Sequence, residues 1–247
     1  MSGRVALVTG AGGGLGSALA IGLHASGYRV ALADTDEGAA AAAAATLDPS
    51  GGTALPLWLD VREIGHWQRA LSALLDRWGA AHVLVNNAAM TVARPVMEIP
   101  PDEFDAVLAV NLRGTFLGCQ VFGGHFRDRG HGRIVNMASL AGQNGGTATG
   151  AHYAASKAGI VALTKVFARD LAPFGVTVNA IAPGPLDTPM VHRTVPPERL
   201  DALRAAIPVG GLGDPGFVAR LVVQLASPEA GFATGATWDV NGGLYMR

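Results

Sequence analysis

Tyr153 and Lys157, four residues apart, are the pair whose types and spacing are best suited to acid–base chemistry. On a helix this spacing places both side chains on the same face. An ammonium beside a phenol favours the phenolate, but the pKa of a phenol, ordinarily near 10, must fall by roughly three units, or about 4 kcal/mol, before the group acts near neutral pH. Ser139 follows the strand pattern at 134–138, so its hydroxyl is expected at a carboxyl strand end, where ligands bind in open parallel sheets.

A glycine-rich turn, Thr9–Gly16, follows the first apolar run of the chain. Glycines at a strand-to-helix turn allow unusual backbone dihedrals and let the backbone approach a pyrophosphate closely. The helix that follows would offer free N–H groups and the positive end of its dipole to the phosphates. Tight turns also use glycine for purely structural reasons, but the context favours the binding interpretation. An acidic residue, Asp34, lies eighteen positions after Gly16, at the end of the second expected strand.

Asp34 also bears on which dinucleotide binds. A carboxylate at this place can accept hydrogen bonds from the ribose hydroxyls of an adenosine and would repel a 2′-phosphate. The turn contains no Arg or Lys to attract such a phosphate, and Asp36 and Glu37 add negative charge. The sequence therefore predicts NAD as the cofactor in preference to NADP. The alternative is that Asp34 is merely a solvated residue at a strand end.

Short β-branched runs that alternate with longer helical patterns would position these residues. Strands are expected at 4–9, 28–33, 54–59, 82–85, 133–137, 177–181 and 236–240. Helical patterns of roughly 10–20 residues between them, such as 15–25 and 65–78, argue for right-handed βαβ units. We therefore predict an α/β fold, a Rossmann-type doubly wound parallel sheet with helices on both faces. Because no change of composition suggests a linker, residues 1–247 are expected to form a single domain.

Composition argues against several classes of protein. A net charge of −1 leaves no strong electrostatic case for binding nucleic acid or an acidic membrane surface. The one cysteine, Cys119, cannot form an internal disulfide, and no Cys/His cluster indicates a metal. No apolar run reaches the roughly 18 residues that span a bilayer, and the N-terminus runs directly into a strand pattern without a signal segment. We therefore expect a cytoplasmic protein that binds no metal and no membrane.

Taken together, these motifs resemble those of the short-chain dehydrogenase/reductase family over essentially the whole chain. Thr9–Gly16 is similar to its TGxxxGxG motif, and Asn86–Ala89 is similar to NNAG with Ala in the last place. Asp60–Val61 resembles the adenine-contacting pair, and Pro183–Gly184 followed by Thr188 resembles the segment around the nicotinamide carboxamide. The positions of the family's catalytic tetrad are occupied by Asn111, Ser139, Tyr153 and Lys157.

The resemblance implies a role for each of these residues. Tyr153 would be the general acid/base, Lys157 would lower its pKa and hold the nicotinamide ribose, and Ser139 would orient and polarise the substrate oxygen. Asn111 would hold a water that connects Lys157 to solvent. The residues implied in dinucleotide binding are Gly10, Gly13, Gly14, Leu15, Gly16, Asp34, Asp60, Val61, Asn87, Ala88, Tyr153, Lys157, Pro183, Gly184, Leu186 and Thr188.

Two segments, the loop 140–150 and the stretch 186–212, are expected to contact the substrate. In the loop, Gln143 and Asn144 either bond a polar substrate group or merely cap the loop. The second stretch carries apolar side chains among prolines and charges, as a mobile lid often does, although core packing would explain the same residues. His152, beside the tyrosine, is expected to be structural. The predicted substrate contacts are Ser139, Gln143, Asn144, Tyr153 and Met190.

The activity implied by the resemblance is the NAD(H)-dependent interconversion of a secondary alcohol and a ketone, on a small-molecule substrate. Segments 207–213 and 237–246 are similar to those of 3-oxoacyl-[acyl-carrier-protein] reductases. That group usually has a basic residue for the NADP 2′-phosphate where this chain has Gly13, and often an arginine for carrier-protein contact where it has Phe174. Reduction of 3-oxoacyl carrier-protein or CoA thioesters is therefore the alternative. A non-catalytic NAD-sensing or scaffold protein is a more remote one.

Two further expectations concern the surface. Arg127, Arg129 and Arg133 would still provide some basic surface for a carrier protein. The family usually assembles as tetramers through its long central helices and tail, so a homotetramer is expected. The small residues that would allow close contact between helices are Ala154, Ala155, Ala158 and Gly159.

Overall fold

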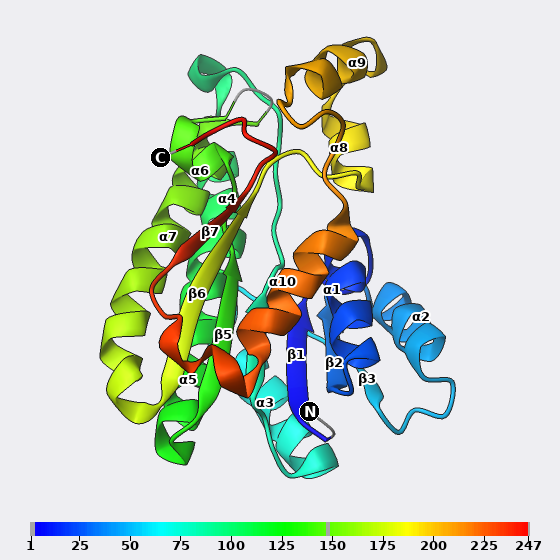
Figure 1. Ribbon diagram of the computed structural model, residues 1–247, viewed down its shortest axis with the longest axis vertical. Coiled ribbons are helices and arrows are strands. Elements are labelled where there is room, and N and C mark those ends of the chain that lie inside the picture. The colour runs from blue at the N-terminus through cyan, green and yellow to red at the C-terminus, as the bar shows by residue number, and fades with distance from the viewer. Residues whose placement is uncertain (1–2, 147–148, 247) are drawn as a thin grey trace.

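The sheet at the centre of the molecule is parallel throughout, as Figure 1 shows for the computed structural model of residues 3–146 and 149–246. Within these residues it has seven strands in the order β3-β2-β1-β4-β5-β6-β7. The strands are β1 (Val5–Thr9), β2 (Arg29–Asp34), β3 (Ala54–Trp58), β4 (Val83–Asn86), β5 (Gly132–Met137), β6 (Val176–Pro183) and β7 (Thr237–Val240). The chain builds outward from β1 to β3 and then crosses to β4 to build the other half, which confirms the predicted Rossmann-type fold.

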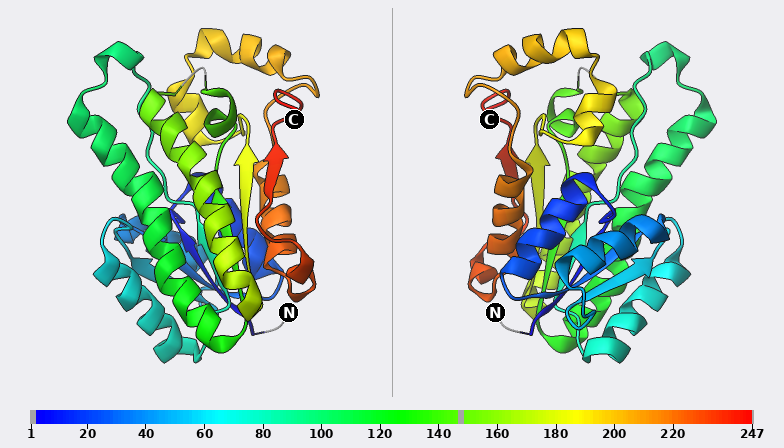
Figure 2. Two further views of the ribbon diagram at one scale, coloured as in Figure 1. Left: turned by 90° about the vertical axis from the view of Figure 1, so that its left-hand side faces the viewer. Right: turned by 90° about the vertical axis from the view of Figure 1, so that its right-hand side faces the viewer.

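Helices cover both faces of the sheet (Figure 2). One face carries α1 (Gly14–Ala25), α2 (Glu37–Leu47) and α10 (Pro215–Ala226), and the other carries α3 (Ile64–Trp78), α5 (Gly114–Arg129) and α7 (Ala151–Leu171). The other helical segments are η1 (Val96–Glu98), α4 (Pro101–Leu108), η2 (Ala109–Arg113), α6 (Ala141–Asn144), η3 (Ala172–Phe174), α8 (Pro189–Thr194), α9 (Pro197–Ala206) and η4 (Pro228–Phe232).

The strands bury side chains on both faces because both faces are covered. In β1, Ala6 and Val8 belong to the core under α1 and α10, whereas Val5 and Leu7 belong to the core under α3 and α5. All four are fully buried. This two-sided burial explains why these strands are continuous apolar runs rather than alternating ones. It leaves the strand ends as the places where polar side chains can meet a ligand.

Arg133, at the start of β5, is buried and therefore does not contribute to the basic surface that the sequence suggested. Its guanidinium donates hydrogen bonds to the carbonyl oxygens of Gly132, Gly175, Ser227 and Pro228. A buried cation is tolerated here because backbone acceptors take up its N–H groups. The arginine therefore ties β5 to the chain that follows α10.

The helix that runs continuously from Pro101 to Arg129 through α4, η2 and α5 differs from one sequence expectation. By length and composition alone it is apolar enough to cross a membrane, with a mean hydropathy of 1.2 over 18 residues. The helix is not an uninterrupted apolar run, because it includes polar residues such as Asn111. In the structure 44% of the window is buried inside the fold, and the core helix of a soluble protein passes the same test. The finding is weak evidence for a membrane span.

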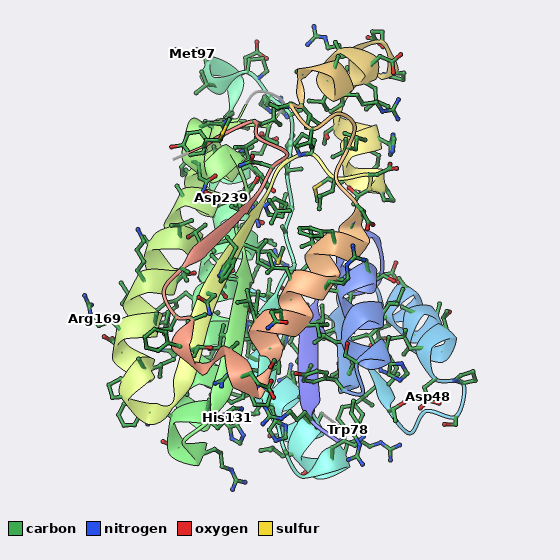
Figure 3. All side chains as sticks on the ribbon, viewed as in Figure 1. Asp48, Trp78, Met97, His131, Arg169 and Asp239 are labelled. Carbon is green, nitrogen blue, oxygen red and sulfur yellow. The ribbon has the colours of Figure 1, made fainter. Side chains whose placement is uncertain are left out.

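Three histidines lie near one another at the amino-terminal edge of the sheet. His82 accepts a backbone N–H from β1 at 3.0 Å, and His131, labelled in Figure 3, contacts the Arg4 guanidinium through Nε2 at 3.0 Å. Burial, with the positive charges of Arg133 and Arg4, lowers the pKa of His131 to about 4. Burial also lowers the pKa of His82 and the pKa of His125.

We predict that this histidine cluster makes the fold sensitive to acid. Where the pKa is lower in the folded than in the unfolded state, the unfolded chain binds more protons, so stability is complete above about pH 6.5 and falls as the pH drops toward about 4. Chemical unfolding across this range should show a falling free energy of unfolding. The fall should be smaller for His131→Gln, whose amide keeps an acceptor for Arg4 but does not titrate. Equal slopes for the variant and the unchanged protein would contradict the prediction.

Candidate active site

A cavity opens at the carboxyl edge of the sheet, toward the top of Figure 1, and residues at or just after the ends of β1 to β6 line it. All 16 residues predicted to bind the dinucleotide lie in its wall, as do Ser139 and Met190 from the predicted substrate contacts. In the described part of the chain, no three His, Cys, Asp or Glu side chains come together as a metal site would require. The parallel direction of the strands therefore gathers residues from the whole length of the chain at one edge.

The glycine turn has the close backbone approach that a bound pyrophosphate requires. Gly10 and Gly14 adopt left-handed backbone, with φ of +64° and +54°. A Cβ on Gly16 would overlap the carbonyl oxygen of Gly10, so that position accepts only glycine. Gly13 has nothing within 4 Å of its Cβ position, and α1 begins after it without a side-chain cap. The first N–H groups of α1 are thus available to a phosphate, and this cradle fits a dinucleotide.

The Asp34 carboxylate is oriented by backbone N–H groups on either side of it. Gly12 donates to its Oδ2 at 2.9 Å, and Asp36 donates to its Oδ1 at 3.1 Å. The side chain lines the cavity at the end of β2. At the neighbouring strand end, Arg62 holds Asp60 in a two-point ion pair with a shortest distance of 2.6 Å. The part of the cavity at the end of β2 therefore has the Asp34 carboxylate held in a defined orientation.

Ser139, Tyr153 and Lys157 meet in the wall of the same cavity, from the end of β5 and the first turns of α7. Lys157 Nζ donates to the Met137 carbonyl at 2.6 Å and lies 5.5 Å from the centroid of the Tyr153 ring. Burial raises the pKa of Tyr153, and a hydrogen bond with Ser139 acts in the opposite direction. Burial also lowers the pKa of Lys157 to about 8. The pKa of the phenol is therefore raised by burial rather than lowered as the sequence analysis expected.

Asn111 does not reach the cavity wall, because its amide is already hydrogen-bonded at both ends. Its Oδ1 accepts the N–H of Met90 at 2.8 Å, and its Nδ2 donates to the Met90 carbonyl and to Ser156 Oγ, each at 3.0 Å. The residue is fully buried in the π-helical turn η2. The side chain connects the loop after β4 to α7, and the water-holding role implied by the resemblance stays a prediction.

Gln143 and Asn144 do not line the cavity, and both make hydrogen bonds within the protein, so their contact with a substrate stays a prediction. Asn144 Oδ1 accepts the N–H of Gly146 at 2.9 Å, within the loop itself. Gln143 Nε2 donates at 2.6 Å to Asp239, which Figure 3 labels on β7. Residues 147–148 of the predicted substrate loop lie outside the described residues.

Known proteins are similar to this chain over nearly its full length. A family model described as enoyl-(acyl carrier protein) reductase matches residues 10–245. An acetoacetyl-CoA reductase of Shinella zoogloeoides is 42% identical over 98% of this chain and 99% of its own. A 3-oxoacyl-[acyl-carrier-protein] reductase of Vibrio harveyi is 40% identical over 100% and 99%, and a (3R)-3-hydroxyacyl-CoA dehydrogenase of Canis lupus familiaris is 38% identical over 98% and 96%. The chain belongs to the short-chain dehydrogenase/reductase family. It is an oxidoreductase that acts on carbonyl and hydroxyl groups with a nicotinamide cofactor.

Sequence reasoning missed two cations in the wall of this short-chain dehydrogenase/reductase cavity, Arg62 and Arg193. Arg62 lies outside the glycine turn, two residues after Asp60, so a cation expected within the turn does not include it. Arg193 comes from α8, within the predicted lid 186–212. Of the two helices in the predicted lid, α8 lines the cavity and α9 does not. Both helices project beyond the carboxyl edge of the sheet (Figure 2), and their closure over a substrate stays a prediction.

The two glycines of the turn provide a matched pair of variants. Gly16→Ala should destabilise the fold by about 1–3 kcal/mol and weaken dinucleotide binding at least about tenfold, because the added methyl group overlaps the Gly10 carbonyl. Gly13→Ala adds the same methyl group in open space and should bind the dinucleotide within about twofold of the unchanged enzyme. Thermal unfolding and titration calorimetry measure the two effects. Equal behaviour of the two variants would show that the backbone approach does not matter.

Proposed function

We propose that this enzyme interconverts 3-oxoacyl and 3-hydroxyacyl thioesters, with NAD(H) as the cofactor. The observation that carries the substrate class is the full-length similarity to three enzymes named for such substrates, at 38% to 42% identity. These similarities favour the thioester alternative over the free secondary alcohol or ketone that the sequence analysis preferred. They also argue against a non-catalytic sensor or scaffold.

Coenzyme A is the thioester carrier that the surface favours over an acyl-carrier protein. Where reductases of the carrier-protein group often have an arginine, Phe174 is exposed. Arg133 is buried among backbone carbonyls and offers no charge to a partner. Arg127 and Arg129 remain at the end of α5, and Arg127 pairs with Asp128. The basic patch expected for an acidic carrier protein is therefore reduced.

NAD(H) is supported by the charge at the end of β2. The Asp34 carboxylate, held by Gly12 and Asp36 N–H groups, would accept hydrogen bonds from the ribose diol and repel a 2′-phosphate. The open position Gly13 lacks the basic side chain that would neutralise such a phosphate. Arg62 is already paired with Asp60, which leaves its charge partly balanced.

A nicotinamide held in this cavity would supply the hydride for the carbonyl carbon at C3 of the substrate. Tyr153 donates its hydroxyl proton to the carbonyl oxygen as negative charge develops there, and the Ser139 hydroxyl donates a hydrogen bond to the same oxygen. In this way the C=O π bond is replaced by one C–H and one O–H bond. In the reverse direction the Tyr153 phenolate accepts the proton of the alcohol.

Burial and charge set the proton affinity of this pair. Burial raises the pKa of Tyr153, which suits a proton donor in reduction, whereas oxidation requires the phenolate. The Lys157 ammonium near the ring favours that phenolate, and the pKa of Lys157 at about 8 keeps most of it protonated at neutral pH. The positive charge of an oxidised nicotinamide in the cavity would favour the phenolate of Tyr153 over the neutral phenol further.

The homotetramer and the cytoplasmic location stay predictions. The outward side of the long helices carries exposed apolar side chains at Phe104, Phe116 and Val166. Exposed apolar surface of this kind supports association between copies of the chain.

The proposal is tested by following NADH and NADPH oxidation with acetoacetyl-CoA and with a free ketone such as ethyl acetoacetate. We expect kcat/KM for acetoacetyl-CoA with NADH to exceed both the value with NADPH and the value with the free ketone by at least about tenfold, or 1.4 kcal/mol. A higher kcat/KM for the free ketone would indicate that the enzyme acts on free secondary alcohols and ketones instead of thioesters. A preference for NADPH would overturn the role of Asp34.

Two substitutions control the cofactor arm of this experiment. Asp34→Ser removes the repelling carboxylate, and Gly13→Arg adds a cation in open space beside it. The double variant should reverse the cofactor preference toward NADPH while the wild-type preference for the thioester is kept. If the double variant still prefers NADH, a group other than Asp34 and Gly13 discriminates between the 2′-hydroxyl and the 2′-phosphate of the cofactor.

Tyr153→Phe should lower kcat by about 10²–10⁴-fold, because it removes the proton donor and leaves the shape of the cavity unchanged. Dinucleotide affinity, measured by fluorescence titration, should stay within about threefold. Tyr245→Phe makes the same chemical change outside the cavity wall and serves as the control. Near-normal turnover in Tyr153→Phe would overturn the assignment.

A further inference from the structure

His152 is fully buried beside the proposed acid/base, and each of its ring nitrogens has a defined partner. Nδ1 accepts the backbone N–H of Tyr153 at 2.8 Å, and Nε2 lies 3.2 Å from Oε1 of Glu103. A backbone N–H can only donate, so Nδ1 carries no proton. Nε2 therefore carries the proton and donates to the Glu103 carboxylate. The ring is held as one neutral tautomer.

Glu103 is fixed on its other side by Arg94. The guanidinium Nε donates to Oε1 at 2.8 Å and Nη2 donates to Oε2 at 2.9 Å, a two-point geometry that fixes the plane of the carboxylate. The hydrogen bonds from Arg94 and His152 lower the pKa of Glu103, so it remains an acceptor for the histidine. A chain of contacts thus runs from the loop after β4, through α4, to the first turn of α7.

The backbone around the histidine is shaped to hold the ring. A Cβ on Gly150 would overlap His152 Cε1, so a larger residue at that position would displace the imidazole. Gly150 also donates its N–H to the Val92 carbonyl at 3.1 Å. The loop that follows β4, whose residues 87–90 line the cavity, is therefore joined to the start of α7 both through Gly150 and through His152.

We propose that His152 is a positioning residue for the reaction, acting on Tyr153 through its backbone N–H and anchored by Glu103 and Arg94. The Tyr153 N–H is shared between Nδ1 at 2.8 Å and the Gly150 carbonyl at 3.1 Å, so the histidine adds a second acceptor that helps to set where the phenol points relative to Ser139. It touches neither substrate nor cofactor, since it does not line the cavity. The inference rests on the proposed role of Tyr153 as the general acid/base.

Three variants separate the two hydrogen bonds of the ring. His152→Asn places an amide oxygen near the position of Nδ1 and keeps an acceptor for Tyr153, whereas His152→Gln reaches toward Glu103 without that acceptor. His152→Leu removes both. We expect kcat, corrected for the fraction of enzyme that binds dinucleotide, to fall at least about tenfold in the Leu and Gln variants and to recover to within about threefold in the Asn variant. KM and dinucleotide affinity should change less than about threefold throughout.

Glu103→Gln tests the anchor. It should lower kcat several-fold in the unchanged background and cause no additional loss in His152→Leu, because the two groups act through one path. His24→Leu removes a histidine that bonds Thr53 far from the cavity and should leave kcat unchanged. If His152→Leu fails to fold, the ratio of kcat between His152→Asn and His152→Gln tests the inference by itself.

Several outcomes would overturn the inference and are distinct from failure of the proposed function. Equal kcat in the Asn and Gln variants, or a loss confined to stability with normal kcat per binding site, would reduce His152 to a structural residue. The assay uses whichever substrate the unchanged enzyme turns over, so a wrong assignment of the thioester does not affect it. Full activity in Tyr153→Phe would instead remove the role on which the inference depends.

Discussion

The structure depends on a directional constraint: all strands of the described sheet run parallel, so every strand delivers its carboxyl end to the same edge. Helices cover both faces and leave that edge as the place where polar groups can meet a ligand without breaking the core. Gly10, Asp34, Ser139 and Pro183 stand far apart in the chain but line one cavity for this reason. The function of the enzyme is in this sense a consequence of strand direction.

Burial has opposite effects on the two ionisable groups at the centre of the site. It raises the pKa of Tyr153 and lowers the pKa of Lys157 to about 8, since a dry environment disfavours the charged form of each. A hydrogen bond with the Ser139 hydroxyl opposes this tendency for the tyrosine. The proposed role of Tyr153 as proton donor in reduction agrees with the raised pKa of its phenol.

The first turn of α7 is held by side chains from other elements. Asn111 joins the loop after β4 to Ser156, and the path from Glu103 to His152 joins α4 to the backbone of Tyr153. A helix terminus that carried a reactive phenol with no such ties would fray, because its first N–H groups have no partner within the helix. The carbonyl of Gly150 also accepts the N–H groups of Tyr153 and Ala154, so local bonds and side chains from other elements together hold this turn.

The sequence by itself determined the order of strands and helices, the glycine turn and the Tyr153–Lys157 pair, because periodicity, turn chemistry and helical spacing act over a few residues. It was insufficient for the substrate class, where full-length relatives favoured thioesters over free ketones. Only the tertiary structure decided that Arg133 is buried and that Gln143 bonds Asp239 of β7. It alone showed that His152 contacts Glu103 of α4. Those outcomes depend on contacts between elements distant in sequence, such as Arg133 with the carbonyl of Pro228, which appear only when the elements are packed.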